Sequence, residues 1–371
     1  MGDSFGGHTM VERQFGIEKD TGVETKLIRI DEQNIDETLI GEAADVIRAG
    51  GLVAFPTETV YGLGGDALNP RSSEKIYKAK GRPSDNPLIV HIANMETLGA
   101  LVREIPEDAV KLAERFWPGP LTMIFYKSEL VPYETTGGLD TVAVRMPANP
   151  IAREFIRASG GYVAAPSANR SGRPSPTVAK YVIEDMDGRI EVIIDGGDVE
   201  IGLESTIVDL TAACPTILRP GYITRQMLEQ VLDIVDEDRT MMRDDSGQAP
   251  KAPGMKYRHY APKGDLTIVD GLEECVVQYI NGQIAAHRAE NKKTGVIATD
   301  ASVCRYHADV SRSAGNRNDE DAIAKELYRI LREFDDEEVE IIYAESFDSN
   351  GIGQAIMNRL LKAAGHKVVH V

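Results

Sequence analysis

Short apolar runs alternate with amphipathic stretches along the first two thirds of this chain. Runs such as Leu52–Phe55 and Leu121–Phe125 have the length and composition of buried strands, whereas apolar residues between Thr38 and Ala49 recur at helical spacing. The expected strands are 27–30, 52–55, 88–92, 121–125, 142–145, 162–165, 192–194 and 207–210, and the expected helices are 38–49, 72–80, 106–116, 151–158 and 224–232. This alternation predicts an α/β domain with a mixed sheet.

Residues 235–264 interrupt the pattern. The stretch from Pro253 to Pro262 holds two tyrosines, a histidine and two cations, which is unlike a flexible Gly/Ser or acidic tether. Beyond it, expected strands at 266–269, 294–297, 340–343 and 367–371 alternate with helices at 273–289, 320–334 and 353–364, which predicts a smaller doubly wound domain. We therefore expect a polar tail (1–22), a first domain (23–234), a linker (235–264) and a second domain (265–371).

Composition agrees with a globular two-domain protein. The chain has 371 residues, 42% of them hydrophobic and 27% charged, with no apolar run long enough to span a bilayer and no secretory signal. Cys214, Cys275 and Cys304 are widely spaced, so we expect neither a disulfide framework nor a zinc cluster, and a cytoplasmic location. The net charge of -18 disfavours broad nucleic-acid binding but permits a local basic cavity.

The segment from Lys80 to His91 carries the densest candidate chemistry. Lys80 and Arg82 stand two residues apart before an apolar run, where both can address one phosphate, so we expect an anion site. No GxxxxGK[ST] motif is present, which excludes ordinary P-loop chemistry. The Gly-rich runs 62–65 and 351–353 are expected to be tight turns or helix caps, with an anion site before the last helix as the weaker alternative.

Further polar residues lie at the ends of expected strands. Thr57 is either a ligand-binding hydroxyl or part of a local turn. Arg145 lies in an apolar strand and needs a partner, which is either a ligand anion or a structural carboxylate, Glu58 or Glu204. Taken together with Ser167, Asn169, Ser175, Ser205 and Arg219, this set suits a phosphate-bearing substrate. His91 and His259 lack the companions of a metal pair, and no GxSxG elbow occurs.

Four motifs resemble one family. They are PTETVYGLG at 56–64, KGR with NPLIVH at 80–91, SAN at 167–169 and PGMKYRHYAP at 253–262. Over residues 26–371 the chain resembles the long form of the threonylcarbamoyl-AMP synthase family, with a YrdC-type domain, a linker and a Rossmann-like C-terminal domain. The resemblance implies that ATP, L-threonine and bicarbonate or CO2 give threonylcarbamoyl-AMP and pyrophosphate, a nucleotidyltransferase reaction. A separate transferase would then modify adenosine 37 of tRNA.

The resemblance also assigns roles to matching positions. It implies that Lys80 and Arg82 are catalytic and that Mg²⁺ accompanies ATP. The implied nucleotide site is Lys80, Arg82, Asn86, Thr141, Ser167, Asn169, Ser175, Arg219 and, as a lid over the nucleotide, Tyr257. The implied threonine site is Thr57, His91, Arg145, the backbone of Ala165, and Ser205.

Two other functions are alternatives to the synthase. An O-carbamoyltransferase of the hydrogenase-maturation type would carry an acylphosphatase-like segment and zinc-ligand cysteines, and neither is visible. An RNA-binding translation-control module is disfavoured by the charge of -18, although a local cavity leaves direct contact with RNA open.

Overall fold

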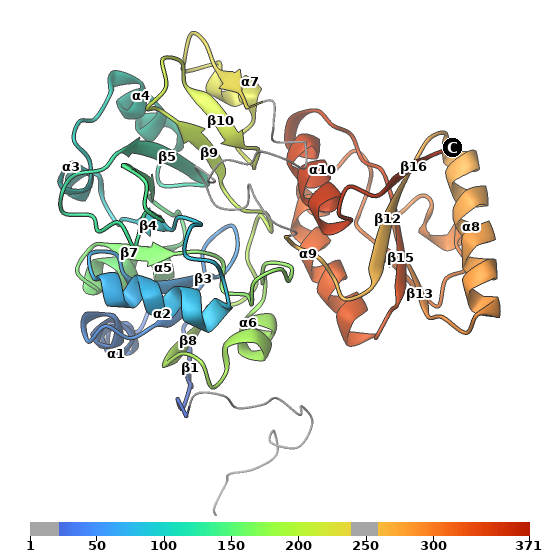
Figure 1. Cartoon of the computed structure of the whole chain (residues 1–371), viewed down its shortest axis with the longest axis horizontal. Helices are drawn as coiled ribbons and strands as arrows, with labels where there is room; N and C mark the ends of the chain where they lie inside the picture. Colours follow the sequence, from blue (N-terminus) through green and yellow to red (C-terminus); the bar gives the residue numbers. More distant parts are fainter. Residues whose placement is uncertain (1–21, 239–258) are drawn as a thin grey trace, which may run out of the picture.

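The computed structural model describes residues 22–238 and 259–371 of the chain. These residues form two α/β parts, each built around its own sheet (Figure 1). The predicted fold class is therefore confirmed, with a twisted mixed sheet in the first part and a parallel sheet in the second. Among the described residues, no helix is both long and apolar enough to cross a membrane.

The first sheet has 11 strands in the order β1-β8-β2-β3-β7-β4-β6-β5-β9-β10-β11. Parallel and antiparallel pairs alternate irregularly along it, and β4 lies between antiparallel β7 and parallel β6. The strands are β1 (Lys26–Arg29), β2 (Val53–Phe55), β3 (Gly62–Asp66), β4 (Ile89–His91), β5 (Leu121–Tyr126), β6 (Thr141–Arg145), β7 (Val163–Ala165), β8 (Val192–Asp195), β9 (Thr206–Asp209), β10 (Thr216–Arg219) and β11 (Asp236–Glu237).

The helices of the first part pack on this sheet. They are α1 (Glu37–Arg48), α2 (Pro70–Lys80), α3 (Leu98–Leu101), α4 (Glu107–Phe116), α5 (Pro150–Ala158), α6 (Ala179–Met186) and α7 (Arg225–Leu228). Local sequence fixes both ends of α2: Asn69 caps its start before Pro70, and Gly81 ends it in the left-handed conformation at φ 62°. Lys80 therefore occupies the last position of a helix, and Arg82 lies just beyond it.

The sequence pattern was wrong at several elements. Residues 62–65, expected to form a tight turn, belong to β3. A Cβ atom on Gly64 would lie 2.8 Å from Val163 Cγ1, so this strand needs glycine for close packing rather than for a turn. The pattern also missed β10 and α6, and α7 is shorter than the expected helix 224–232.

The second sheet has the order β14-β13-β15-β12-β16, and each neighbouring pair in it is parallel. Its strands are β12 (Asp265–Asp270), β13 (Thr294–Ala298), β14 (Val310–Ser313), β15 (Ile341–Glu345) and β16 (Val368–His370). Helix α8 (Glu273–Ala289) covers one face, and α9 (Glu320–Asp336) and α10 (Gly351–Ala363) cover the other (Figure 1). This arrangement confirms the doubly wound prediction. The missed strand β14 lies at the edge.

Helices α9 and α10 face the first part of the molecule (Figure 1). Val60 and Leu203 of the first part belong to the same buried apolar cluster as residues of α9 and α10. Two buried ion pairs cross the same boundary: Arg332–Asp185 at 2.6 Å and Arg359–Glu204 at 2.9 Å. Apolar and ionic contacts therefore join the two parts next to the polar strand ends.

Candidate functional site

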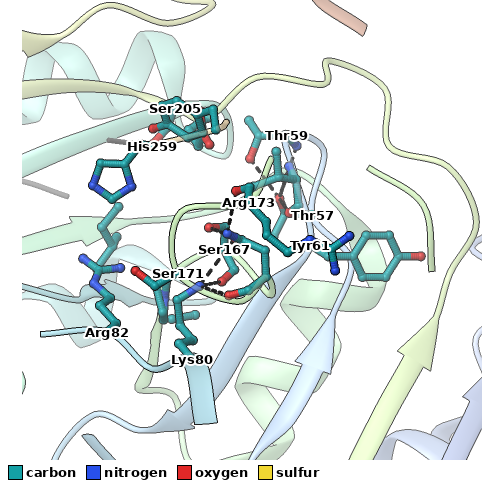
Figure 2. Close-up of a pocket in the computed structure, with 18 of the residues that line it drawn as sticks. Thr57, Thr59, Tyr61, Lys80, Arg82, Ser167, Ser171, Arg173, Ser205 and His259 are labelled. Carbon is teal, nitrogen blue, oxygen red and sulfur yellow. Dashed lines mark hydrogen bonds between the residues drawn. The ribbon is translucent and has the colours of Figure 1, made fainter. Parts of the chain in front are cut away.

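Lys80 and Arg82 point their charged groups into one cavity (Figure 2). The Nζ atom of Lys80 donates to the carbonyl oxygens of Ser167 and Asn169, the second at 2.5 Å. Burial and the neighbouring Arg82 lower the pKa of Lys80. Burial also lowers the pKa of Arg82 to about 10, and Arg219 acts in the same direction. Both cations would therefore gain from a bound anion.

The loop after β7 forms the facing wall. Ser167 Oγ donates to Asn169 Oδ1 at 2.5 Å, while Asn169 Nδ2 donates to the carbonyl oxygens of Arg170 and Arg173 at 2.8 and 2.9 Å. These bonds fix the loop in one conformation and present its carbonyls to Lys80. Ser167 and Asn169, the two polar residues that follow strand β7, therefore belong to a loop that is ordered by its own hydrogen bonds.

At the other end of the cavity, Thr57 and Arg145 both make structural contacts within the protein, which was one of the two alternatives for each. Thr57 Oγ1 donates to the carbonyl oxygen of Val60 at 2.6 Å, so Thr57 does form a local turn while lining the cavity. Arg145 Nη2 lies 2.7 Å from Glu58 Oε1, with both side chains buried, and Arg145 Nη1 donates to Thr59 Oγ1 at 2.8 Å. Glu58 is thus the structural partner of Arg145.

His91 is neutral in this site. Its Nδ1 atom lies 3.1 Å from the carbonyl oxygen of Ile89, and the backbone of Val163 is a second hydrogen-bond partner of the ring. Burial, followed by the charge of Arg145, lowers the pKa of His91 to about 3. A histidine so placed serves as a hydrogen-bonding group rather than as a cation at neutral pH.

Ser205 and Arg219 come together on the remaining wall. Arg219 donates from Nε to the Ser205 carbonyl oxygen at 3.0 Å and from Nη2 to Ser205 Oγ at 3.1 Å. Ser205 Oγ also lies 2.7 Å from Thr122 Oγ1 of β5. Ser205, just before β9, therefore connects Arg219 of β10 with Thr122 of β5.

The cavity encloses about 700 Å³ of empty space when its opening to solvent is included. It gathers most of the predicted residues: Lys80, Arg82, Ser167, Asn169, Arg219, Thr57, His91, Arg145, Ala165 and Ser205. Asn86, Thr141 and Ser175 do not line it, and Tyr257 lies outside the described residues. Asn86 is nevertheless buried beside the site, and neither its Oδ1 nor its Nδ2 has a hydrogen-bond partner among the described residues.

Several lining residues were not assigned to the site from the sequence. They are Thr59, Tyr61, Ser171, Arg173, Glu204, His259 and Tyr260. Glu204 was expected only as a possible partner for Arg145, whereas its carboxylate bonds Ser175 of the first domain and Tyr328 and Arg359 of the second. One signal for Glu204 was its position between Leu203 and Ser205, which are both buried in the structure. A charged residue in such a stretch needs a partner, but the sequence does not show which residue that partner is.

The cavity is cationic although the chain has a net charge of -18. Among its described lining residues are five cations, Lys80, Arg82, Arg145, Arg173 and Arg219, against the single carboxylate Glu204. The described ranges contain no group of three His, Cys, Asp or Glu side chains that could hold a metal ion. The site is therefore built to hold an anion.

Comparisons with known proteins agree with both domains. Residues 45–221 match a family model described as "Telomere recombination", and residues 223–365 match one described as "Threonylcarbamoyl-AMP synthase, C-terminal domain". A threonylcarbamoyl-AMP synthase of Pyrococcus abyssi is 49% identical over 91% of this chain and 98% of its own length. One of Bacillus subtilis is 46% identical over 91% of this chain and 96% of its own.

A solved structure supports the same grouping. The crystal structure of P. abyssi Sua5 complexed with L-threonine superposes with a TM-score of 0.87 at 48% identity, over 94% of this chain and 99% of that one. The similarity therefore includes both sheets. It favours the synthase over the two alternative functions.

Proposed function

Because this chain belongs to the threonylcarbamoyl-AMP synthase family, we propose that its cationic cavity joins L-threonine, bicarbonate or CO2, and ATP. The products are threonylcarbamoyl-AMP and pyrophosphate, which makes the chain a nucleotidyltransferase. The observation that carries this proposal is the gathering of Lys80, Arg82 and Arg219 around one cavity with a single carboxylate among its described lining residues. The similar P. abyssi protein is described in complex with L-threonine, which supports an amino-acid site next to the phosphate site.

The reaction requires charge stabilisation more than proton transfer. The threonine amine and CO2 form a carbamate, and a carbamate oxygen then attacks the α-phosphorus of ATP. A new P–O bond forms as the bond to the bridging oxygen breaks and pyrophosphate leaves with that electron pair. Negative charge spreads over the phosphoryl oxygens, so the donors of Lys80 and Arg82 lower the barrier.

The threonine carboxylate is assigned to Arg145. A guanidinium has five N–H donors. The contacts of Arg145 with Thr59, Gly119 and Glu58 account for three, which leaves donors on the two Nη atoms. These suit a carboxylate, while neutral His91 and the hydroxyls of Thr57 and Ser205 supply uncharged hydrogen bonds.

We expect Mg²⁺ to be bound by the phosphates of ATP rather than by a set of protein ligands. Glu204, the carboxylate lining the described part of the cavity, already accepts hydrogen bonds from Ser175, Tyr328 and Arg359. Mg²⁺ prefers oxygen ligands and commonly keeps substrate phosphates among them, where it offsets their charge. We therefore expect the ion to enter with the triphosphate and to be required for turnover.

The decisive assay mixes the protein with ATP, Mg²⁺ and bicarbonate, with and without L-threonine. We expect pyrophosphate release that depends on threonine, together with threonylcarbamoyl-AMP detected by mass spectrometry. Pyrophosphate release at the same rate without threonine contradicts the proposal. Chelating Mg²⁺ with EDTA should stop the reaction, and adding Mg²⁺ back should restore it.

The product is a mixed anhydride and needs an acceptor. We propose that a separate tRNA threonylcarbamoyl transferase consumes it in the cytoplasm. The three free thiols of Cys214, Cys275 and Cys304 suit that reducing compartment. Copurification or direct transfer from this chain's product to tRNA by such an enzyme is the corresponding test.

A further inference from the structure

Glu204 connects the cavity wall to the second domain. It is 7% exposed and precedes β9. Its Oε1 atom accepts a hydrogen bond from Ser175 Oγ at 2.6 Å. Its Oε2 atom accepts from Tyr328 Oη on α9 and from Arg359 Nε on α10, both at 2.9 Å. Among the described residues, the second domain thus supplies two of the three donors to a carboxylate that lines the cavity.

Glu204 is unsuited to proton transfer. Burial alone would raise its pKa, but Arg359, Arg219 and the hydrogen bond from Ser175 outweigh burial and lower the pKa to about 2. A carboxylate with that pKa is a weak base at neutral pH. Its three directed hydrogen bonds suit it instead to hold its neighbours in place.

Two arginines of the second domain also hold backbone next to predicted nucleotide residues. Arg332 donates from Nε and Nη2 to the carbonyl oxygen of Pro174, at 3.0 and 2.6 Å, one residue before Ser175. Arg359 donates from Nη1 to the carbonyl oxygen of Pro220 at 2.8 Å, one residue after Arg219. Both arginines are almost completely buried. The first contact fixes the segment of Ser175, which also bonds the Glu204 carboxylate, and the second fixes the segment of Arg219 through the same Arg359 that bonds Glu204.

We propose that Glu204 is a positioning residue for ATP, an inference that rests on the proposed function. Through it, Tyr328 and Arg359 of the second domain hold the wall of the cavity in the conformation that binds the nucleotide. The second domain therefore completes the nucleotide site without lying in it. If Glu204 only joined the two domains, the same hydrogen bonds would form. Breaking one of them would then weaken ATP binding no more than breaking any other contact between the domains.

Two tyrosine-to-phenylalanine variants form a matched test. Tyr328→Phe removes one hydroxyl that bonds the cavity carboxylate. Tyr181→Phe removes one hydroxyl that also crosses between the domains, to Asp336 at 3.2 Å, but away from the cavity. Isothermal titration with a non-hydrolysable ATP analogue and Mg²⁺ should show about three- to tenfold weaker binding for Tyr328→Phe, since a hydrogen bond to a charged group is lost. Tyr181→Phe should change affinity less than about twofold.

Glu204→Gln separates positioning from charge. Removing a negative charge from a cationic cavity would strengthen binding of an anion, if charge were all that Glu204 supplied. If Glu204 positions the wall, Gln weakens ATP binding instead, because one of the two accepting oxygens becomes an NH2 donor and Arg359 loses its negatively charged partner. Stronger binding by Glu204→Gln would overturn the proposal. Thermal melting checks that each variant folds, and Tyr328→Phe decides the question should Glu204→Gln fail to fold.

The wild-type chain separates failure of this inference from failure of the proposed function. If it binds the ATP analogue and releases pyrophosphate only with threonine, the proposed function holds. Equal affinities for Tyr328→Phe and Tyr181→Phe would then contradict the positioning role alone. A wild-type chain that neither binds the analogue nor releases pyrophosphate contradicts the proposed function itself, and with it this inference.

Discussion

Lys80 is held at the end of α2 by the carbonyl oxygens of Ser167 and Asn169, so its ammonium group has a fixed position in the cavity. We expect Lys80→Ala to reduce threonine-dependent pyrophosphate release at least about 100-fold, since a preorganised donor to the phosphoryl oxygens is lost. Lys78→Ala is the matched control, because Lys78 is exposed on the same helix. A Lys80→Ala variant with the activity of the control would remove Lys80 from the catalytic role.

His91 makes the fold sensitive to acid. Burial and then Arg145 lower its pKa to about 3 in the folded protein, whereas an unfolded histidine titrates near 6.5. Above pH 6.5 the residue contributes no pH dependence. As the pH falls from about 6.5 toward 3, the unfolded chain takes up a proton that the folded chain refuses, so the free energy of unfolding decreases.

The matching variant is His91→Gln. Between pH 6.5 and 5.0, wild type should lose about 2 kcal/mol more of its free energy of unfolding than the variant does, since one proton is worth about 1.4 kcal/mol per pH unit. Urea unfolding at both pH values measures the difference. Parallel losses in the two proteins would show that the folded and the unfolded chain protonate His91 to the same extent, so that its pKa is not lowered by folding.

At the scale of elements, Gly202 sets how closely α9 approaches the first domain. It adopts φ +84°, and a Cβ atom there would lie 2.5 Å from Lys325 Cα and 2.7 Å from the Ala324 carbonyl oxygen. We expect Gly202→Ala to lower the free energy of unfolding by about 2–4 kcal/mol, from left-handed strain plus overpacking. Chemical denaturation of the purified variant gives the value.

Gly197→Ala measures the cost of the left-handed backbone conformation without the steric clash against α9. Gly197 has nearly the same backbone conformation, φ +86°, but a Cβ atom there would meet nothing within 4 Å. This variant should cost only about 1–2 kcal/mol. Equal losses at Gly197 and Gly202 would show that α9 tolerates the extra methyl group.

Elements were predictable where one physical signal dominated. The α8 bounds follow from a long helical pattern, and α2 has a capping asparagine, a proline and a terminal glycine. The strand β3 was missed because glycine usually weakens strands, and only the partners Val163 and Phe55 explain why glycine is needed. Tertiary crowding of this kind leaves no mark in the local sequence.

At the scale of the whole molecule, the sequence revealed the cavity better than the contacts between the domains. Lys80 ends an expected helix and Ser167 follows an expected strand, so their convergence could be expected, whereas Arg219 ends β10, which the pattern missed. The role of the second domain could not, because no local pattern pairs Arg359 with Glu204, 155 positions apart. Such a pairing depends on how two complete sheets dock.

That docking predicts cooperative unfolding of the two domains. Val60 and Leu203 of the first domain are buried in the apolar cluster of the second, and the Arg332–Asp185 and Arg359–Glu204 pairs are buried with them. Separating the domains would expose the apolar residues and leave buried charges without partners, at a cost of several kcal/mol. One domain therefore cannot unfold without strongly destabilising the other.

Trp117 offers a direct test, because it is the single tryptophan of the chain and lies buried in the first domain. Ile280 is fully buried on α8, on the sheet face turned away from the first domain (Figure 1). Ile280→Ala should destabilise the second domain by about 2–5 kcal/mol. If unfolding is coupled, it should also lower the temperature at which Trp117 fluorescence changes, whereas Gln278→Ala on the exposed face of α8 should not. An unchanged Trp117 transition in Ile280→Ala would mean that the domains unfold independently, and that the buried ion pairs between them open before either core melts.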